Sequence, residues 1–152
     1  MCIRDRDKTT GFVGVAGARV FNQSAVWWEG AQSNGSPNHS GIVWHGKKLD
    51  DMFMSFYGAP AGNVVVLDGL FLAAKGRTVN SIQLTKPKTF EGDWDFYDIF
   101  YTFQAYRKGL KNKAIPIQIL HGSGGELAGR ESWFKNKDAF LRLFGQYLPA
   151  TI

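Results

Sequence analysis

Asp98 is the residue best suited to acid–base chemistry, and it lies in the segment Phe-Tyr-Asp-Ile-Phe at positions 96–100. Apolar spacing predicts a helix over residues 95–110, with Gly109 at its end. Asp98 falls in the first turn, where the helix N-terminus stabilises a carboxylate and the helical period directs it away from the apolar stripe. We therefore expect an ionised, outward-facing group suited to be a general base. The alternative is an ordinary helix-start acid, with Asp95 as the N-cap.

A second carboxylate, Asp68, follows a β-branched run and precedes Gly69. Residues 63–74 predict a strand, a tight Asp-Gly turn and a returning hairpin arm at 70–74. A carboxylate at a strand end can bind sugar hydroxyls, and the glycine would let a ligand approach the backbone. A hairpin turn needs no ligand, so both interpretations stay open.

His121 follows the segment Ala-Ile-Pro-Ile-Gln-Ile-Leu at 114–120, which predicts a strand that Pro116 places at a sheet edge. It also opens a predicted flexible, Gly-rich turn at 121–125. An imidazole at the carboxyl end of a strand can face a cleft. No other metal-ligating residue lies at ligand spacing nearby, so a structural histidine is the alternative.

Aromatic residues flank a loop rich in Gly, Ser and Asn at 30–41: Trp27-Trp28 precede it, and Trp44-His45 follow it. Indole faces stack on sugars, but paired tryptophans also fill cores. Two further elements complete the framework. Residues 11–18 predict a buried strand interrupted by glycines. Residues 131–148 predict a helix, and its expected apolar stripe is Trp133, Phe134, Phe140, Leu141, Phe144 and Leu148.

In chain order these segments resemble the signature of family-2-like glycosyltransferases. Phe96–Phe100 resembles the family's Phe-Tyr-Asp-Ile-Asp. The family's helix continues into an Ala-Arg-x-x-Gly ending, for which this chain has Ala-Tyr-Arg-Lys-Gly at 105–109. His121-Gly-Ser-Gly-Gly resembles a later His-x-Ser-x-Gly turn. The upstream matches are Gly14–Gly17, Trp27-Trp28 and Val66–Phe71. The resemblance covers about residues 11–148 and implies a partial GT-A fold: a Rossmann-like α/β structure with a mixed sheet flanked by helices.

The resemblance further implies transfer of a sugar from a nucleotide-sugar donor to a glycan or other hydroxyl acceptor, inverting and assisted by Mn²⁺ or Mg²⁺. It implies Asp98 as the catalytic base, and His121 as a metal or diphosphate contact. The substrate-binding residues it implies are Asp68, Gly69, Trp27, Trp28 and Tyr97. Phe100 stands where the family has a second acidic residue. The alternative function is therefore a non-catalytic carbohydrate-binding remnant of the same fold.

The family's Asp-x-Asp metal motif has no match at its usual place in the chain. Asp93-Trp94-Asp95 fits the motif in sequence, but it directly precedes the predicted helix. We expect the donor-binding N-terminal half to lie upstream of this sequence. The charge-alternating start predicts a non-native leader over residues 1–8. Residues 9–152 then form a single domain, the acceptor-side part of the enzyme.

Composition excludes several other classes. The 152 residues contain 44% hydrophobic residues, which indicates a globular chain, and a single cysteine, which excludes a multi-cysteine zinc site. No apolar run approaches the roughly 20 residues of a membrane-spanning helix. The net charge of +5 is spread along the chain and does not form the basic stripe of a nucleic-acid binder. We expect a cytoplasmic protein, in solution or at a membrane surface.

Overall fold

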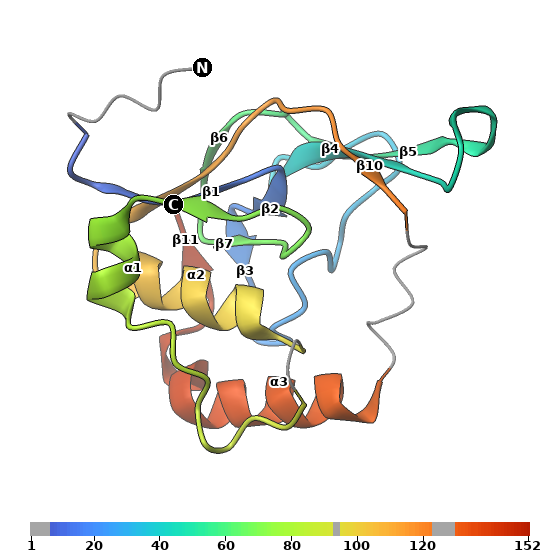
Figure 1. The fold of residues 1–152 in the computed structure, drawn as a ribbon. Coiled ribbons are helices and arrows are strands. Elements are labelled where there is room, and N and C mark those ends of the chain that lie inside the picture. The colour runs from blue at the N-terminus through green and yellow to red at the C-terminus, as the bar shows by residue number, and fades with distance from the viewer. Residues whose placement is uncertain (1–6, 93–94, 123–129) are drawn as a thin grey trace.

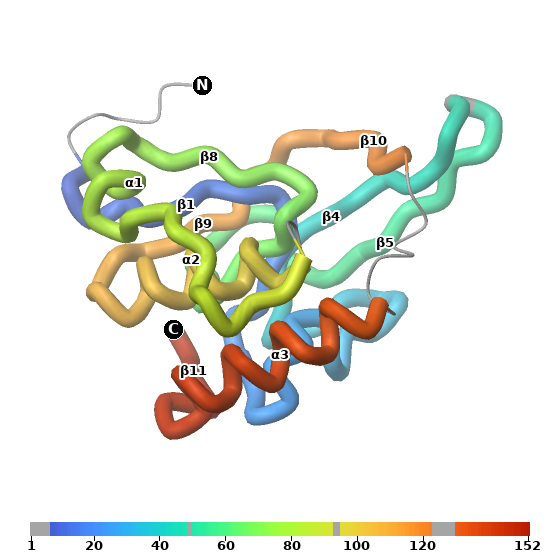
Figure 2. Tube along the Cα trace, turned by 60° about the horizontal axis from the view of Figure 1, so that its bottom comes forward, coloured from blue at the N-terminus to red at the C-terminus, as the bar shows by residue number. Residues whose placement is uncertain are grey.

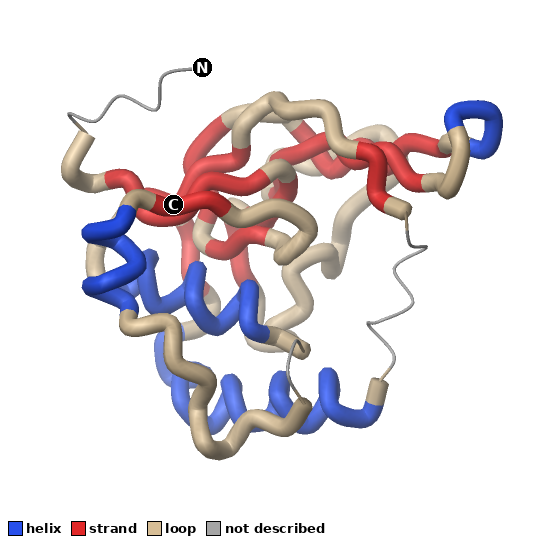
Figure 3. Tube along the Cα trace, viewed as in Figure 1, coloured by secondary structure: helices blue, strands red, loops and turns tan. Residues whose placement is uncertain are grey.

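In the computed structural model most of the strands lie on one side of the molecule and the α-helices pack on the other (Figures 1 and 3). The structure describes residues 7–92, 95–122 and 130–152. Three predicted features lie wholly or partly outside these ranges: the leader, the Asp93-Trp94-Asp95 sequence and the Gly-rich turn. The strands are β1 (Thr10–Gly14), β2 (Ala16–Ala18), β3 (Val20–Phe21), β4 (His39–His45), β5 (Phe53–Gly58), β6 (Gly62–Val64), β7 (Val66–Leu67), β8 (Ala73–Ala74), β9 (Lys111–Ala114), β10 (Leu120–His121) and β11 (Ala150–Thr151). The helices are α1 (Gly76–Ile82), α2 (Tyr97–Arg107), α3 (Glu131–Phe144) and the 3₁₀ turns η1 (Leu49–Asp51) and η3 (Gly145–Tyr147).

The strands form mixed sheets. One has the order β6-β9-β1-β8, with β1 and β9 parallel and the other pairs antiparallel. The second has the order β10-β4-β2-β7, with β5 paired to β4 and only β10 and β4 parallel. A short ladder joins β11 to β3. The mixed α/β class that the sequence predicts is confirmed, and it agrees with a partial Rossmann-like glycosyltransferase fold.

The glycine-interrupted strand is also confirmed. Residues 10–18 are extended but divide at Val15, so β1 and β2 belong to different sheets. Gly17 lies so close to β7 that a Cβ there would collide with the Val66 carbonyl oxygen. The loop that follows β3 ends earlier than predicted, since β4 begins at His39.

The hairpin predicted over residues 63–74 is wrong. β7 pairs with β2, and β8 pairs with β1 across Phe12 and Ala74. The Asp-Gly turn is present, but its backbone N–H groups are hydrogen-bonded to side chains. Asp68 Oδ1 accepts a hydrogen bond from the Leu70 N–H, and Asp98 accepts one from the Gly69 N–H. With those donors satisfied, the chain can leave the turn without returning along its own strand.

The single strand predicted at 114–120 is wrong as well. β9 ends at Ala114, β10 begins at Leu120, and Pro116 lies between them. β9 is an inner strand between β6 and β1, where a proline would remove a ladder hydrogen bond. The proline therefore marks the place where the chain passes from one sheet to the other.

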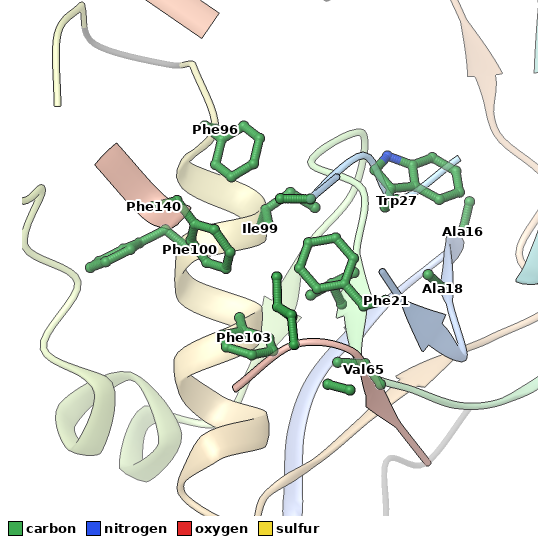
Figure 4. Close-up of a cluster of buried hydrophobic side chains, with 14 of the residues drawn as sticks. Ala16, Ala18, Phe21, Trp27, Val65, Phe96, Ile99, Phe100, Phe103 and Phe140 are labelled. Carbon is green, nitrogen blue, oxygen red and sulfur yellow. The ribbon is translucent and has the colours of Figure 1, made fainter. Parts of the chain in front are cut away.

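Helix α2 confirms the predicted helix within the predicted range, and Gly109 follows it with φ of +77°. Helix α3 starts at the predicted residue but ends at Phe144, and Phe134 of its predicted stripe is 48% exposed. Rings from α2, α3 and β3 form the core in Figure 4, where Phe103 lies 5.3 Å from Phe140 and 5.7 Å from Phe21 between ring centroids. In the described parts of the chain, no helix combines the length and apolarity needed to span a membrane.

Asn112 joins three segments inside this fold. Its side-chain amide is fully buried; Oδ1 accepts a hydrogen bond from the Phe12 N–H at 3.0 Å, and Nδ2 donates to the carbonyls of Val65 and Thr102. One side chain thus ties β1, the β6–β7 connection and α2 together.

We expect Asn112→Ala to lower the free energy of unfolding by about 3 kcal/mol or more, because it leaves several buried backbone groups without partners. Urea denaturation measures this. Asn63→Ala is the matched control: Asn63 is exposed on β6, beside β9, and its loss should change stability by less than about 0.5 kcal/mol. Equal stability of the two variants would show that the Asn112 hydrogen bonds do not hold the segments together.

Candidate functional site

The start of helix α2 meets the turn that follows β7, and this junction brings Asp98 and Asp68 together. Asp98 Oδ2 accepts a hydrogen bond from the Gly69 N–H at 2.7 Å, and its Oδ1 accepts one from the Ile99 N–H at 2.8 Å. Asp68, the residue before Gly69, acts electrostatically on Asp98. Two carboxylates predicted from separate segments therefore share one half-buried site.

The helix start is held by its neighbours. Phe96 is the N-cap with φ of +67°, a left-handed conformation that non-glycine residues rarely adopt. Its ring is buried 5.4 Å from the rings of Trp133 and Phe140, which hold it in place. The prediction of Asp95 as the N-cap is wrong, because the Asp95 carboxylate accepts a hydrogen bond from the Ser132 hydroxyl instead.

Thr102, one turn after Asp98, fastens the helix to the sheet. Its hydroxyl donates to the Asp98 carbonyl at 2.7 Å and accepts from the Leu67 N–H at 3.2 Å. Sequence reasoning missed this residue, although its i+4 spacing places it on the Asp98 face of the helix. Helix α2 thus cannot slide along β7 without breaking the hydrogen bond from Leu67.

The surroundings of both carboxyls raise their pKa values. Burial, and after it the charge of Asp68, raises the pKa of Asp98 to about 7. Burial also raises the pKa of Asp68, against hydrogen bonds from Leu70 and Trp27 that favour its charged form. The expectation of an outward-facing Asp98 that is always ionised is wrong: the helix N-terminus turns this side chain toward the Gly69 turn, where removal from water outweighs the amide hydrogen bonds.

Gly69 allows the close approach, but the group beside it belongs to the protein. A Cβ at position 69 would lie 2.7 Å from the Tyr97 hydroxyl and 3.1 Å from Asp98 Oδ2. The Tyr97 hydroxyl donates to the Gly69 carbonyl at 3.1 Å, and burial raises the pKa of this phenol, so it stays a donor. The Tyr97 hydroxyl therefore fills the space that a side chain at position 69 would need.

The two tryptophans differ in position. Trp27 is 4% exposed, and its indole N–H donates to Asp68 Oδ2 at 3.0 Å. Trp28 is half-buried, with its ring 5.8 Å from Trp27 and 5.7 Å from Trp133. Trp27 thus supports Asp68 from within the core, and Trp28 has the more open side chain of the pair.

His121 lies near Asp68, together with a second histidine. β10 and β4 pair His121 with His45; the two rings are 5.4 Å apart, and both residues act electrostatically on Asp68. Within the described ranges, however, no group of three or more His, Cys, Asp or Glu side chains is placed to hold a metal ion. The described ligand set does not fit a divalent metal, which prefers several convergent oxygen or nitrogen donors.

The raised pKa of Asp98 predicts how stability depends on pH. Between about pH 4 and pH 7 the unfolded carboxyl, with its ordinary pKa of 3.8, has lost its proton while the folded carboxyl still holds it. The free energy of unfolding should therefore fall as the pH rises through this range, and level off above it.

Urea denaturation at a series of pH values should show a weaker dependence for Asp98→Asn than for the unaltered chain. The matched control is Asp138→Asn, since Asp138 is exposed on α3 and should leave the slope as it is. An unchanged slope in Asp98→Asn would contradict the burial argument.

Comparison with known proteins identifies a family for this chain. A family model described as "Glycosyltransferase like family" matches residues 2–120. No curated protein and no solved structure matched the chain. The family match covers most of the chain, including both carboxylates, and confirms the resemblance to a glycosyltransferase family; it ends before the His121 motif. The chain belongs to this glycosyltransferase-like family.

Proposed function

We propose that this chain forms the acceptor side of a glycosyltransferase that moves a sugar from a nucleotide-sugar donor to a hydroxyl acceptor, with Asp98 as the general base. The observation that carries the proposal is the Asp98 carboxyl, held by two backbone amides with a pKa near 7. A base works best when its pKa lies near the working pH. A cytoplasmic location, which a single cysteine fits, stays a prediction.

The reaction would run as a single displacement. The ionised Asp98 takes the proton of the acceptor hydroxyl as that oxygen attacks the anomeric carbon. The bond from this carbon to the donor diphosphate breaks, the nucleoside diphosphate leaves, and the configuration inverts. The Gly69 and Ile99 amides orient the carboxylate, since each fixes one of its oxygens.

Other predicted residues take supporting roles. Asp68 and Tyr97 would bind sugar hydroxyls beside the base, and Trp27 would keep Asp68 in position through its indole N–H. Trp28 would lie at the edge of the same region. His121 would act on it electrostatically, through the charge of Asp68. Mn²⁺ or Mg²⁺ assistance, with His121 as a contact, stays a prediction from the family, and no step here is routed through it.

One observation favours the carbohydrate-binding alternative. Phe100, where the family has its second acidic residue, is 7% exposed and packs against Phe90 and Phe144. An acidic network extending along the helix is therefore absent at this position. The following variants separate the two functions, because binding without transfer would survive loss of the base.

In the full-length protein we expect Asp98→Asn to lower the transfer rate about 10²- to 10⁴-fold, because an amide cannot accept the proton of the acceptor hydroxyl. Release of nucleoside diphosphate from a panel of nucleotide hexoses, with hydroxyl acceptors present, measures the rate. Donor affinity should be unchanged, and exposed Asp138→Asn should transfer normally. Transfer at the normal rate in Asp98→Asn would refute the assignment of the base.

The rate should also rise with pH and level off above about pH 7, because only ionised Asp98 accepts a proton. Asp68→Asn removes the neighbouring negative charge, so it lowers the pKa of Asp98 and should move this rise to lower pH. A profile of transfer rate against pH for both proteins measures the shift. A rise at the same pH in both would show that the two carboxylates do not interact.

A further inference from the structure

A strip of side chains runs along β5, from the buried carboxylates to the rim of the molecule. Successive side chains of a strand alternate between faces, so Phe53 and Ser55 share a face. A bulge interrupts this alternation at Tyr57, whose hydroxyl is hydrogen-bonded to Ser55. The inner end of the strip is at Tyr57, whose ring lies 4.9 Å from Trp27 and whose hydroxyl is affected by the charge of Asp68.

The outer end of the strip is an exposed aromatic ring. Phe53 is 59% exposed, the largest exposed fraction among the large hydrophobic residues of the described chain. It pairs with His45 across the β4–β5 ladder, and the two rings stack with centroids 4.9 Å apart and planes 16° apart. His45 thus covers one face of the phenyl ring and leaves the other available to a ligand.

The same face continues onto β10. His121 pairs with His45, and both histidines act on Asp68, so the row Phe53–His45–His121 leads to the carboxylate site. β4, β5 and β10 lie side by side in both views, with the β4–β5 hairpin reaching away from the helices (Figures 1 and 2). The exposed phenyl ring is thus linked to the carboxylate site through the two histidines.

We propose that this strip is an acceptor-sugar subsite, in which the outer face of Phe53 stacks on the apolar face of a pyranose ring, and Ser55 and Tyr57 bind its hydroxyls. This proposal deepens the proposed function, on which the word acceptor rests. Aromatic rings beside hydroxyls and carboxylates suit a ligand that carries both C–H and O–H groups.

The charge of the hairpin favours a neutral saccharide over a nucleoside diphosphate. Its tip exposes Lys47 and Lys48 together with Asp50 and Asp51, which sum to zero. A diphosphate would gain little from such a tip, and the carboxylates at the inner end would repel it. A neutral sugar meets no such repulsion.

The test measures binding by the 152-residue chain, without transfer. Methyl β-D-glucopyranoside, methyl β-D-galactopyranoside and UDP are titrated separately, with saturation-transfer NMR as the readout. We expect at least one glycoside to bind, and Phe53→Ala to weaken it about fivefold to tenfold, the value of one stacking contact. Phe53→Trp should restore the affinity.

Met54→Ala is the matched control. Met54 is the next residue of β5, is 48% exposed and faces the opposite side, so its loss should leave glycoside binding unchanged. Equal affinities in Phe53→Ala and Met54→Ala would overturn the proposal, as would the absence of glycoside binding. A Phe53-dependent affinity for UDP alone would also overturn it, because the ring would then stack on a nucleobase.

Failure of this inference is distinguishable from failure of the proposed function. If glycoside affinity is the same with and without Phe53 while transfer depends on Asp98, the subsite proposal is refuted and the assignment of the general base is kept. If glycoside binding depends on Phe53 while transfer by the full-length protein does not depend on Asp98, the assignment of the base is refuted and the sugar subsite is kept.

Discussion

The hydrogen bond from the Gly69 N–H to Asp98 is the contact on which the rest of the site depends, because it joins the turn after β7 to the start of α2. It requires a residue without a Cβ at position 69, since the Tyr97 hydroxyl occupies that space. It also requires the helix to begin abruptly, which the left-handed Phe96 achieves. The left-handed backbone of Phe96 is unfavourable by itself, and the space beside Gly69 restricts that position to glycine. Both are explained by the need to hold the Asp98 carboxylate against the Gly69 amide.

Two half-buried carboxylates weaken the fold near neutral pH, so the surrounding structure must offset their cost. The offset is visible around them. Phe21, Phe103 and Phe140 fill the core below the site, and Asn112 satisfies three buried backbone groups at the junction of α2 with the strands. Proteins commonly tolerate such local destabilisation at functional sites, because a base with an ordinary pKa would be a weak proton acceptor.

The sequence predicted α2 and most of α3 better than the pairing of the strands, but it did not predict α1. The apolar period of α2 and the residues at its first turn were sufficient to predict its extent and Asp98 within it. Strand pairing depends on contacts distant in sequence: whether β8 pairs with β7 or with β1 is decided by side chains such as Asp68 and Asp98 that satisfy the turn amides. Phe53 is linked to the candidate site only through the β4–β5 register, which pairs it with His45 and which no local pattern specifies.

Phe100 changes how the acidic pair of this family should be understood in this chain. At its position the helix faces Phe90 and Phe144, and burying a carboxylate among these rings would be unfavourable. The carboxylate that does stand beside Asp98 comes from a different element, the turn after β7. Because Asp68 receives hydrogen bonds from Leu70 and Trp27 while Asp98 receives two backbone amides, each has its own support. Replacing the helical acid by phenylalanine therefore removes one carboxylate without leaving Asp98 as the sole acidic group of the site.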